Sequence, residues 1–143
     1  MAKDENEKHF VGQIAQKAFI ENDKGQVLLV QYPEGDSSAG LWDLPGGRLN
    51  EGESAIDGLK REVLEEVGAE ITVNEIIATH PRVINETFRL FIVVYRASFV
   101  DPTLTLVPEA GEIGKIEWKD KSEFTSLPLI DRNYPEMLKA FLV

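Results

Sequence analysis

Apolar residues gather in short runs along the chain, separated by polar turn segments, as is typical of a protein rich in strands. Phe10 to Ile20 is apolar and β-favouring, and residues 26–32, QVLLVQY, form a second compact apolar run. Between them, Asn22 to Gly25 (NDKG) is a strong turn signal. This pattern predicts two strands joined as a hairpin, followed by a loop at residues 33–40, PEGDSSAG.

Two longer strands are predicted in the middle of the chain, at residues 70–80 and 87–99. In the second, both sets of alternating side chains are apolar, as expected of a strand that is covered on both faces. One set is Phe88, Leu90, Ile92 and Val94, and the other is Phe91, Val93 and Tyr95. A further short strand is predicted near the end of residues 111–120, GEIGKIEWKD.

A helix is predicted for residues 54–67, where apolar positions recur at helical spacing. Ser54 and Asp57 have the form of a capping box, although its usual second residue is Glu or Gln. Gly68 suits the position that ends a helix. The segment between LWDLPGG and Gly68 therefore predicts a loop leading into a capped helix.

A last helix is predicted for residues 134–143, with Pro135 in its first turn and Asn133 or Asp131 as its cap. Strands mixed with a few helices predict a single α/β or α+β sandwich domain over residues 1–143. Residues 1–8 are nearly all polar or charged, and we expect them to be frayed.

Composition narrows the possible functions and partners. The formal net charge of -10 argues against binding a nucleic-acid polymer, which needs a basic surface. The absence of cysteine excludes disulfides, thiolate zinc sites and cysteine nucleophiles. The first residues have no apolar signal-peptide core, and no apolar run reaches the length of a membrane span. We therefore expect a cytoplasmic protein with no membrane partner.

The helix carries an unusual concentration of negative charge. At about 100° per residue, Glu62, Glu65 and Glu66 fall within an arc of roughly 100°, beside a separate apolar stripe. That stripe consists of Ile56, Leu59, Val63 and Val67. Each like-charge pair costs the helix roughly 0.2–0.5 kcal/mol, which a bound divalent cation would offset. Alone, the run is more typical of a solvated helix edge on which Arg61 pairs with Glu65.

The surrounding spacing resembles the signature of the Nudix (MutT-like) hydrolases, G-x5-E-x7-R-E-U-x-E-E-x-G-U, where U is a bulky aliphatic residue. Ala69 stands at the final U, the one departure. Residues 41–47 and 111–118 are similar to the sequences that flank this signature in the family. The matching positions are Gly47, Glu53, Arg61, Glu62, Val63, Glu65, Glu66 and Gly68.

The resemblance implies the Nudix α/β/α sandwich, with a mixed β-sheet between helices and the signature as a loop–helix–loop. It implies that Glu62 and Glu66 bind Mg2+ or Mn2+, and that Glu65 is a further or water-mediated ligand. Arg61 would orient Glu53 or Glu65 through a bidentate ion pair.

Five further residues are candidates for substrate binding or catalysis. Glycines permit close backbone approach, so Gly46 and Gly47 could expose amides to a phosphate, or simply form a turn. Arg48 could reach a substrate phosphate. Glu112 is the candidate outside the signature for a further ligand or the general base, and Glu109 is its rival.

The activity implied is Mg2+-dependent hydrolysis of the diphosphate linkage in a nucleoside diphosphate linked to another group, X. Residues 79–90, THPRVINETFRL, show no marker that identifies X. The short chain resembles the family members that cleave (d)NTPs more than those that cleave ADP-ribose or nucleotide sugars. The alternative from another functional class is a non-catalytic domain that senses a nucleotide. Many members of the family are homodimers, so a second copy of the chain is a candidate partner.

Overall fold

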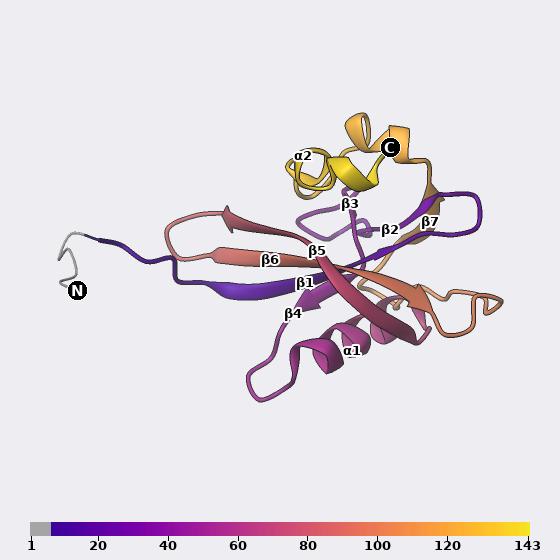
Figure 1. The fold of residues 1–143 in the computed structure, drawn as a ribbon, viewed down its shortest axis with the longest axis horizontal. Helices are drawn as coiled ribbons and strands as arrows, with labels where there is room; N and C mark the ends of the chain where they lie inside the picture. The colour runs from indigo at the N-terminus through magenta and orange to yellow at the C-terminus, as the bar shows by residue number, and fades with distance from the viewer. Residues whose placement is uncertain (1–6) are drawn as a thin grey trace.

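Two β-sheets with helical segments on either side make up residues 7–143, the part of the chain that the computed structural model describes (Figure 1). The strands are β1 (Gln13–Ile20), β2 (Val27–Gln31), β3 (Trp42–Asp43), β4 (Gly46–Arg48), β5 (Ile71–Val83), β6 (Arg89–Phe99) and β7 (Lys115–Lys119). The helical segments are α1 (Ala55–Val67), the 3₁₀ turn η1 (Lys121–Thr125), α2 (Tyr134–Met137) and the 3₁₀ turn η2 (Lys139–Phe141).

The larger sheet has the strand order β4-β1-β6-β5 and is mixed. Strand β1 runs parallel to β6, whereas the β1–β4 and β5–β6 pairs are antiparallel. A second, antiparallel sheet has the order β3-β2-β7. The expected mixed sheet and α+β class are confirmed, while the division of the strands into two sheets was not predicted.

The predicted first hairpin is correct at its turn and wrong in its pairing. The backbone N–H of Asn22 donates to the carbonyl of Gln26 at 3.0 Å, and Glu21 forms an isolated bridge with Val27. Beyond that bridge the strands separate into different sheets. Each becomes the central strand of its own sheet, β1 between β4 and β6, and β2 between β3 and β7.

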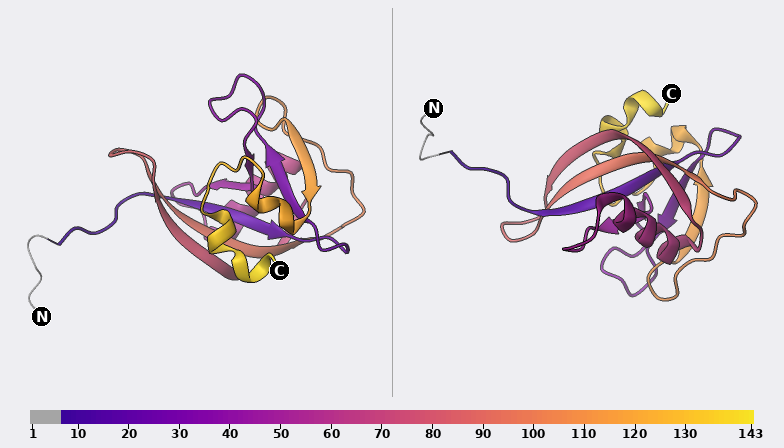
Figure 2. Two further views of the ribbon diagram at one scale, coloured as in Figure 1. Left: turned by 90° about the horizontal axis from the view of Figure 1, so that it is seen from above. Right: turned by 60° about the horizontal axis from the view of Figure 1, so that its bottom comes forward.

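Alternate side chains of β1 enter two different hydrophobic layers. Phe19 packs in a cluster with Tyr134 and Leu138 from the C-terminal segment. Ala18 and Ile20 pack in another cluster, formed with α1. Figure 2 shows α1 and the C-terminal helices on opposite sides of the long strands. The larger sheet is therefore covered on both faces, as its apolar strands predicted.

Local sequence signals define the ends of α1. The Ser54 side chain accepts a hydrogen bond from the Asp57 N–H at 3.2 Å, and Gly68 adopts a left-handed conformation with φ of 76°. Leu59, Val63 and Val67 are fully buried, but Ile56 is 39% exposed. The predicted apolar stripe is thus confirmed except at its first residue.

The C-terminal segment differs most from its prediction. Helix α2 covers only Tyr134–Met137, and the chain continues as the 3₁₀ turn η2 instead of one helix over 134–143. Here the Phe141 N–H donates to the carbonyl of Leu138 at 2.8 Å, an i to i−3 bond that hydrophobic spacing alone does not predict. Asn133 occupies the cap position without a side-chain cap bond, and Asp131 accepts its backbone N–H.

Several strand boundaries also differ from the prediction. Strand β5 extends to Val83 and has irregular register between Val73 and Ala78, while β3 and β4 lie within a segment that carried no strand prediction. Most of the expected frayed start, residues 1–6, lies outside the described residues. Glu7 and Lys8 are exposed and outside any helix or strand. None of the helices in residues 7–143 is long and apolar enough to span a membrane.

Candidate active site

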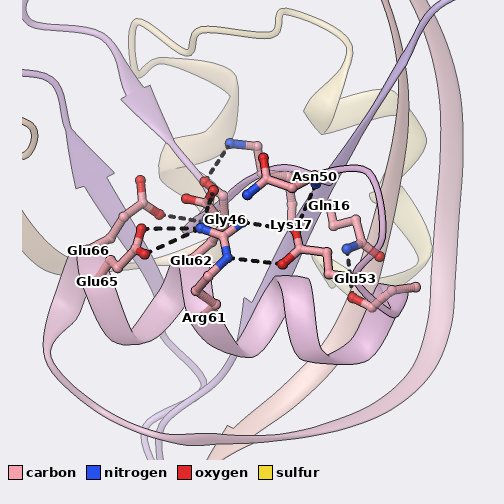
Figure 3. A network of polar contacts seen from close by, with 10 residues as sticks. Gln16, Lys17, Gly46, Asn50, Glu53, Arg61, Glu62, Glu65 and Glu66 are labelled. Carbon is pink, nitrogen blue, oxygen red and sulfur yellow. Dashed lines mark hydrogen bonds and ion pairs between the residues drawn. The ribbon is translucent and has the colours of Figure 1, made fainter.

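The signature residues come together where β4 and the following loop lie against α1. Strand β4 pairs with β1 in a register that places Gly46 opposite Lys17. Figure 3 shows the carboxylates of Glu62, Glu65 and Glu66 along the side of α1 that faces this loop. Local capping of the helix and pairing of β4 with β1 together determine where these side chains point.

Arg61 ties the loop to the helix through a bidentate ion pair with Glu53. Its Nε donates to Glu53 Oε2 at 3.1 Å and its Nη2 donates to Glu53 Oε1 at 2.9 Å. The Asn50 N–H donates to the same carboxylate at 2.7 Å. Hydrogen bonds from Arg61 and then from Asn50 lower the pKa of Glu53 below its ordinary value. Glu53 is therefore an anchored carboxylate.

The same guanidinium also contacts two carboxylates of the helix. Arg61 Nη1 lies 3.1 Å from Glu62 Oε1 and 3.3 Å from Glu65 Oε1. The sequence left open whether Arg61 pairs with Glu53 or Glu65. The structure shows both contacts and adds Glu62.

Glu66 is the buried member of the cluster. Only 8% of it is exposed, and its Oε1 accepts the Gly46 N–H at 2.6 Å. Burial raises its pKa to about 8, although attraction to Lys17 and the Gly46 hydrogen bond oppose the shift. Repulsion from Asp43 and Glu62 adds to the increase. Ionised Glu66 is thus disfavoured unless a cation compensates it.

Both glycines of β4 are needed because neighbouring atoms lie where a side chain would begin. A Cβ on Gly46 would lie 2.0 Å from the carbonyl oxygen of Gln16, and the φ of Gly46 is 139°. A Cβ on Gly47 would lie 2.5 Å from the carboxyl carbon of Glu62. The Gly46 N–H is already bonded to Glu66, so its role in this structure is to position that carboxylate.

Of the two candidates outside the signature, Glu109 has the more direct connections to the cluster. Its backbone N–H donates to the carbonyl of Glu66 at 3.1 Å. Burial, followed by repulsion from Glu65, Glu112 and Glu62, raises the pKa of Glu109. Glu112 is exposed, and its N–H donates to the carbonyl of Glu109. The two glutamates therefore lie one turn apart beside the end of α1.

A cavity of about 460 Å³ is lined by Lys17, which contacts the Gly46 carbonyl. Its lining contains polar groups that the sequence did not identify. Lys17, Tyr32, Asp43 and Tyr134 are among them. Of these, only Asp43 lies in a segment that the sequence analysis connected with function, residues 41–47. Aliphatic and aromatic side chains line another part of the cavity, including Ile84, Phe88, Leu90 and Ile92.

Arg48 also lines this cavity, but two neighbours hold its guanidinium. Its Nη1 donates to Gln13 Oε1 at 3.0 Å, and the group lies 5.6 Å from the centre of the Phe88 ring. Arg82, from β5, is a second cationic lining residue, and its Nη2 donates to the carbonyl of Ile130.

The carboxylate cluster has the chemistry of a hard-cation site. In the present arrangement no three Asp, Glu or His side chains of residues 7–143 surround a common point, since Arg61 engages Glu62 and Glu65. The donor set nevertheless fits Mg2+ or Mn2+, which prefer carboxylate oxygens. Burial is the main cause of the raised pKa values of Glu66 and Glu109, and repulsion from neighbouring carboxylates adds to it. A bound cation would offset both effects by neutralising the negative charge.

Known proteins resemble this chain over most of its length. The NUDIX domain model matches residues 13–141. The CTP pyrophosphohydrolase of Escherichia coli (strain K12) is 33% identical over 125 residues, which cover 87% of either chain. Nudix hydrolase 2 of Arabidopsis thaliana is 31% identical over 126 residues, 85% of this chain but 43% of that protein. The crystal structure of the MutT protein from Methanosarcina mazei Go1 matches with a TM-score of 0.78 and 26% identity, covering 90% of this chain and 91% of that one.

Proposed function

The chain belongs to the Nudix hydrolase family, enzymes that act on pyrophosphate bonds, and we propose that it hydrolyses a nucleoside diphosphate linked to X in the presence of Mg2+ or Mn2+. The observation that carries this proposal is the position of the carboxylate cluster. Glu66 and Lys17 both bond to Gly46, so this residue links the cluster to Lys17, which lines a cavity of about 460 Å³. That volume falls in the range of pockets that bind small molecules.

Within this class we favour a (d)NTP, for which X is phosphate. The support is the E. coli relative named CTP pyrophosphohydrolase, which matches this chain over nearly the full length of both proteins. The apolar and aromatic side chains of the cavity suit a nucleoside, and Lys17, which contacts Gly46, suits its phosphates.

The chain's own residues have distinct tasks in this reaction. Glu62, Glu65 and Glu66 hold the cation, and Arg61 with Glu53 fixes the loop against the helix that carries them. The bound cation supplies charge neutralisation at the phosphates and a water of lowered pKa. Glu109 or Glu112 accepts the proton of the attacking water. Preorganised charge of this kind provides most of the rate in such displacements.

A substrate screen tests the proposal. Wild-type protein is incubated with Mg2+ and each of the (d)NTPs, nucleotide sugars, ADP-ribose, NADH and dinucleoside polyphosphates, and the products are identified by chromatography. We expect a (d)NTP to give the fastest turnover, with a nucleoside monophosphate and pyrophosphate as products. Faster cleavage of ADP-ribose or a nucleotide sugar would replace the (d)NTP assignment with the alternative substrate class.

The same screen separates an enzyme from a nucleotide-sensing domain. A sensor binds a nucleotide without releasing phosphate or pyrophosphate. The chain retains every carboxylate of the signature, and this is the reason to favour catalysis. Glu109→Gln and Glu112→Gln are then compared on the best substrate. The general base is the glutamate whose replacement removes the loss of activity at low pH, because a general base acts only when deprotonated.

A further inference from the structure

Lys17 is a buried cation at the edge of the cavity, and the proposed function gives it no task. It lies on β1, is 7% exposed and lines the cavity. Its Nζ donates to Asp43 Oδ2 at 2.8 Å and lies 3.4 Å from the carbonyl oxygen of Gly46. These contacts use two of its three N–H groups and leave one for a ligand.

Asp43 is held by donors on every side. Its Oδ2 accepts a hydrogen bond from the Tyr32 hydroxyl at 2.5 Å in addition to that from Lys17, and its Oδ1 accepts one from the Tyr134 hydroxyl at 2.6 Å. The carboxylate therefore has little capacity left for a substrate. The three contacts instead hold the ammonium of Lys17 in one place.

Stability alone does not explain this arrangement. Replacing a buried ion pair with apolar residues of similar volume is often neutral or stabilising, because both charges lose their hydration. Burial lowers the pKa of Lys17, but attraction to Asp43 and other negative groups outweighs this effect and raises it above the ordinary value. The side chain therefore stays cationic throughout the neutral range.

The ammonium lies between the two parts of the proposed substrate site. Gly46 accepts a hydrogen bond from Lys17 through its carbonyl and donates one to Glu66 through its N–H, so one residue separates the cation from the carboxylate cluster. The apolar walls of Leu90 and Ile92 belong to the same cavity. A substrate with its base in the cavity and its terminal phosphates at the cluster would bring its first phosphate past Lys17.

We propose that Lys17 binds a non-bridging oxygen of the phosphate joined directly to the nucleoside, and that Asp43, Tyr32 and Tyr134 are positioning residues for it. This inference rests on the proposed function, since it requires a nucleotide in the cavity. It makes Lys17 a contact for the phosphate that every nucleoside diphosphate derivative shares, independent of X.

The test compares binding of the four common ribonucleosides with that of their 5′-monophosphates, measured by calorimetry in EDTA so that bound metal contributes nothing. In wild-type protein, the monophosphate of the preferred base should bind about tenfold or more tightly than its nucleoside, as expected for a charge-assisted hydrogen bond. Lys17→Met should remove this difference while leaving the affinity for the nucleoside unchanged. Lys24→Met, in the exposed turn after β1, should preserve the difference.

A second variant addresses folding. Lys17→Met combined with Asp43→Asn removes both charges and keeps an oxygen acceptor for one tyrosine hydroxyl and an N–H donor toward the other, so it should fold and show the same loss. If Lys17→Met and the double variant keep the wild-type preference for the monophosphate, or weaken nucleoside and monophosphate equally, the Lys17 assignment is wrong. If neither nucleosides nor monophosphates bind to wild-type protein in EDTA, the Lys17 assignment is also wrong, because the proposed contact does not need the metal. The proposed function fails separately, if the Mg2+ screen shows no hydrolysis.

Discussion

Burial, together with repulsion from Asp43 and Glu62, raises the pKa of Glu66 to about 8, against the opposing effects of Lys17 and of the hydrogen bond from Gly46. Between about pH 5 and pH 8, metal-free folded protein holds a proton on Glu66 that the unfolded chain has already released. In EDTA the free energy of unfolding should therefore fall as the pH rises through this window, by up to about 1.4 kcal/mol per pH unit. Urea denaturation at a series of pH values measures the slope.

Glu66→Gln provides the matched control, because it keeps an oxygen acceptor for the Gly46 N–H and removes the titration. The two proteins differ only at this side chain, so the difference between the two curves isolates Glu66. Parallel curves from pH 5 to pH 8 would contradict the raised pKa. Adding Mg2+ should reduce the loss of stability in wild type more than in the variant.

Arg61 contacts three carboxylates, and the planar fork of its guanidinium makes the bidentate pair with Glu53 possible. Arg61→Lys keeps the charge but cannot make both bonds. We expect kcat to fall roughly tenfold to a hundredfold, as is typical when residues that orient metal ligands are altered. The melting temperature should change little, because the ion pair is partly exposed. Steady-state kinetics and thermal denaturation measure the two effects. An unchanged kcat would show that the bidentate Arg61–Glu53 pair has no role in catalysis.

At the level of single residues, sequence spacing predicted the cluster but not its surroundings. Gly47, Glu53, Arg61 and the helix glutamates lie within 20 residues of one another, so a linear motif describes them. Lys17, Tyr32 and Tyr134 meet Asp43 across separations of 26, 11 and 91 residues. Nothing in their local sequence distinguishes them from core residues, because only the folded sheet brings them together.

At the level of elements, the contact between β4 and α1 depends on two glycines. Gly46→Ala should destabilise the protein by about 2 kcal/mol or more, since the added Cβ would clash with the backbone of Gln16 at a positive φ. Gly47→Ala should mainly displace the Glu62 carboxylate, and so reduce Mg2+-dependent turnover with a smaller loss of stability.

Gly52→Ala is the control for the glycine variants. Gly52 also has a positive φ, 87°, but a Cβ there would meet no atom within 4 Å. It should cost only about 1 kcal/mol, the usual penalty for that backbone conformation. Denaturation and turnover of the three variants provide the measurement, and equal effects of Gly47→Ala and Gly52→Ala on turnover would contradict the displacement of Glu62.

Elements defined by local signals were predicted well, and those defined by distant contacts were not. The cap at Ser54 and the left-handed Gly68 determine both ends of α1 from within the segment itself. The partners of β1 and β2 depend on residues far along the chain, since β1 pairs with β6 and β2 with β7. The turn at Asn22 was therefore visible in the sequence, whereas the separation of its two arms was not.

At the level of the whole molecule, the C-terminal segment is an integral layer of the fold. Leu138 is fully buried in the cluster that includes Phe19 and Tyr134. Leu138→Ala should lower the free energy of unfolding by about 2–5 kcal/mol, the range for a leucine removed from a packed core. Leu104→Ala, at a position 51% exposed, should change it by less than about 0.5 kcal/mol. Chemical denaturation compares them, and a small effect at Leu138 would show that this layer contributes little.

The two sheets position the helix that carries the carboxylates. A cavity lined by the cationic side chain of Lys17 lies close to this negative charge. The central claim is that this charge binds a divalent cation for hydrolysis of a diphosphate bond. The most direct measurement is Mg2+-dependent turnover of the best (d)NTP by wild type, Glu62→Gln and Glu66→Gln, with Glu70→Gln as a control on an exposed glutamate just after α1.

Circular dichroism confirms folding of each variant before turnover is compared. The account predicts that Glu62→Gln and Glu66→Gln lose roughly a hundredfold or more in kcat while remaining folded, and that Glu70→Gln keeps wild-type turnover. Near wild-type turnover by Glu66→Gln would contradict the metal assignment and with it the proposed mechanism.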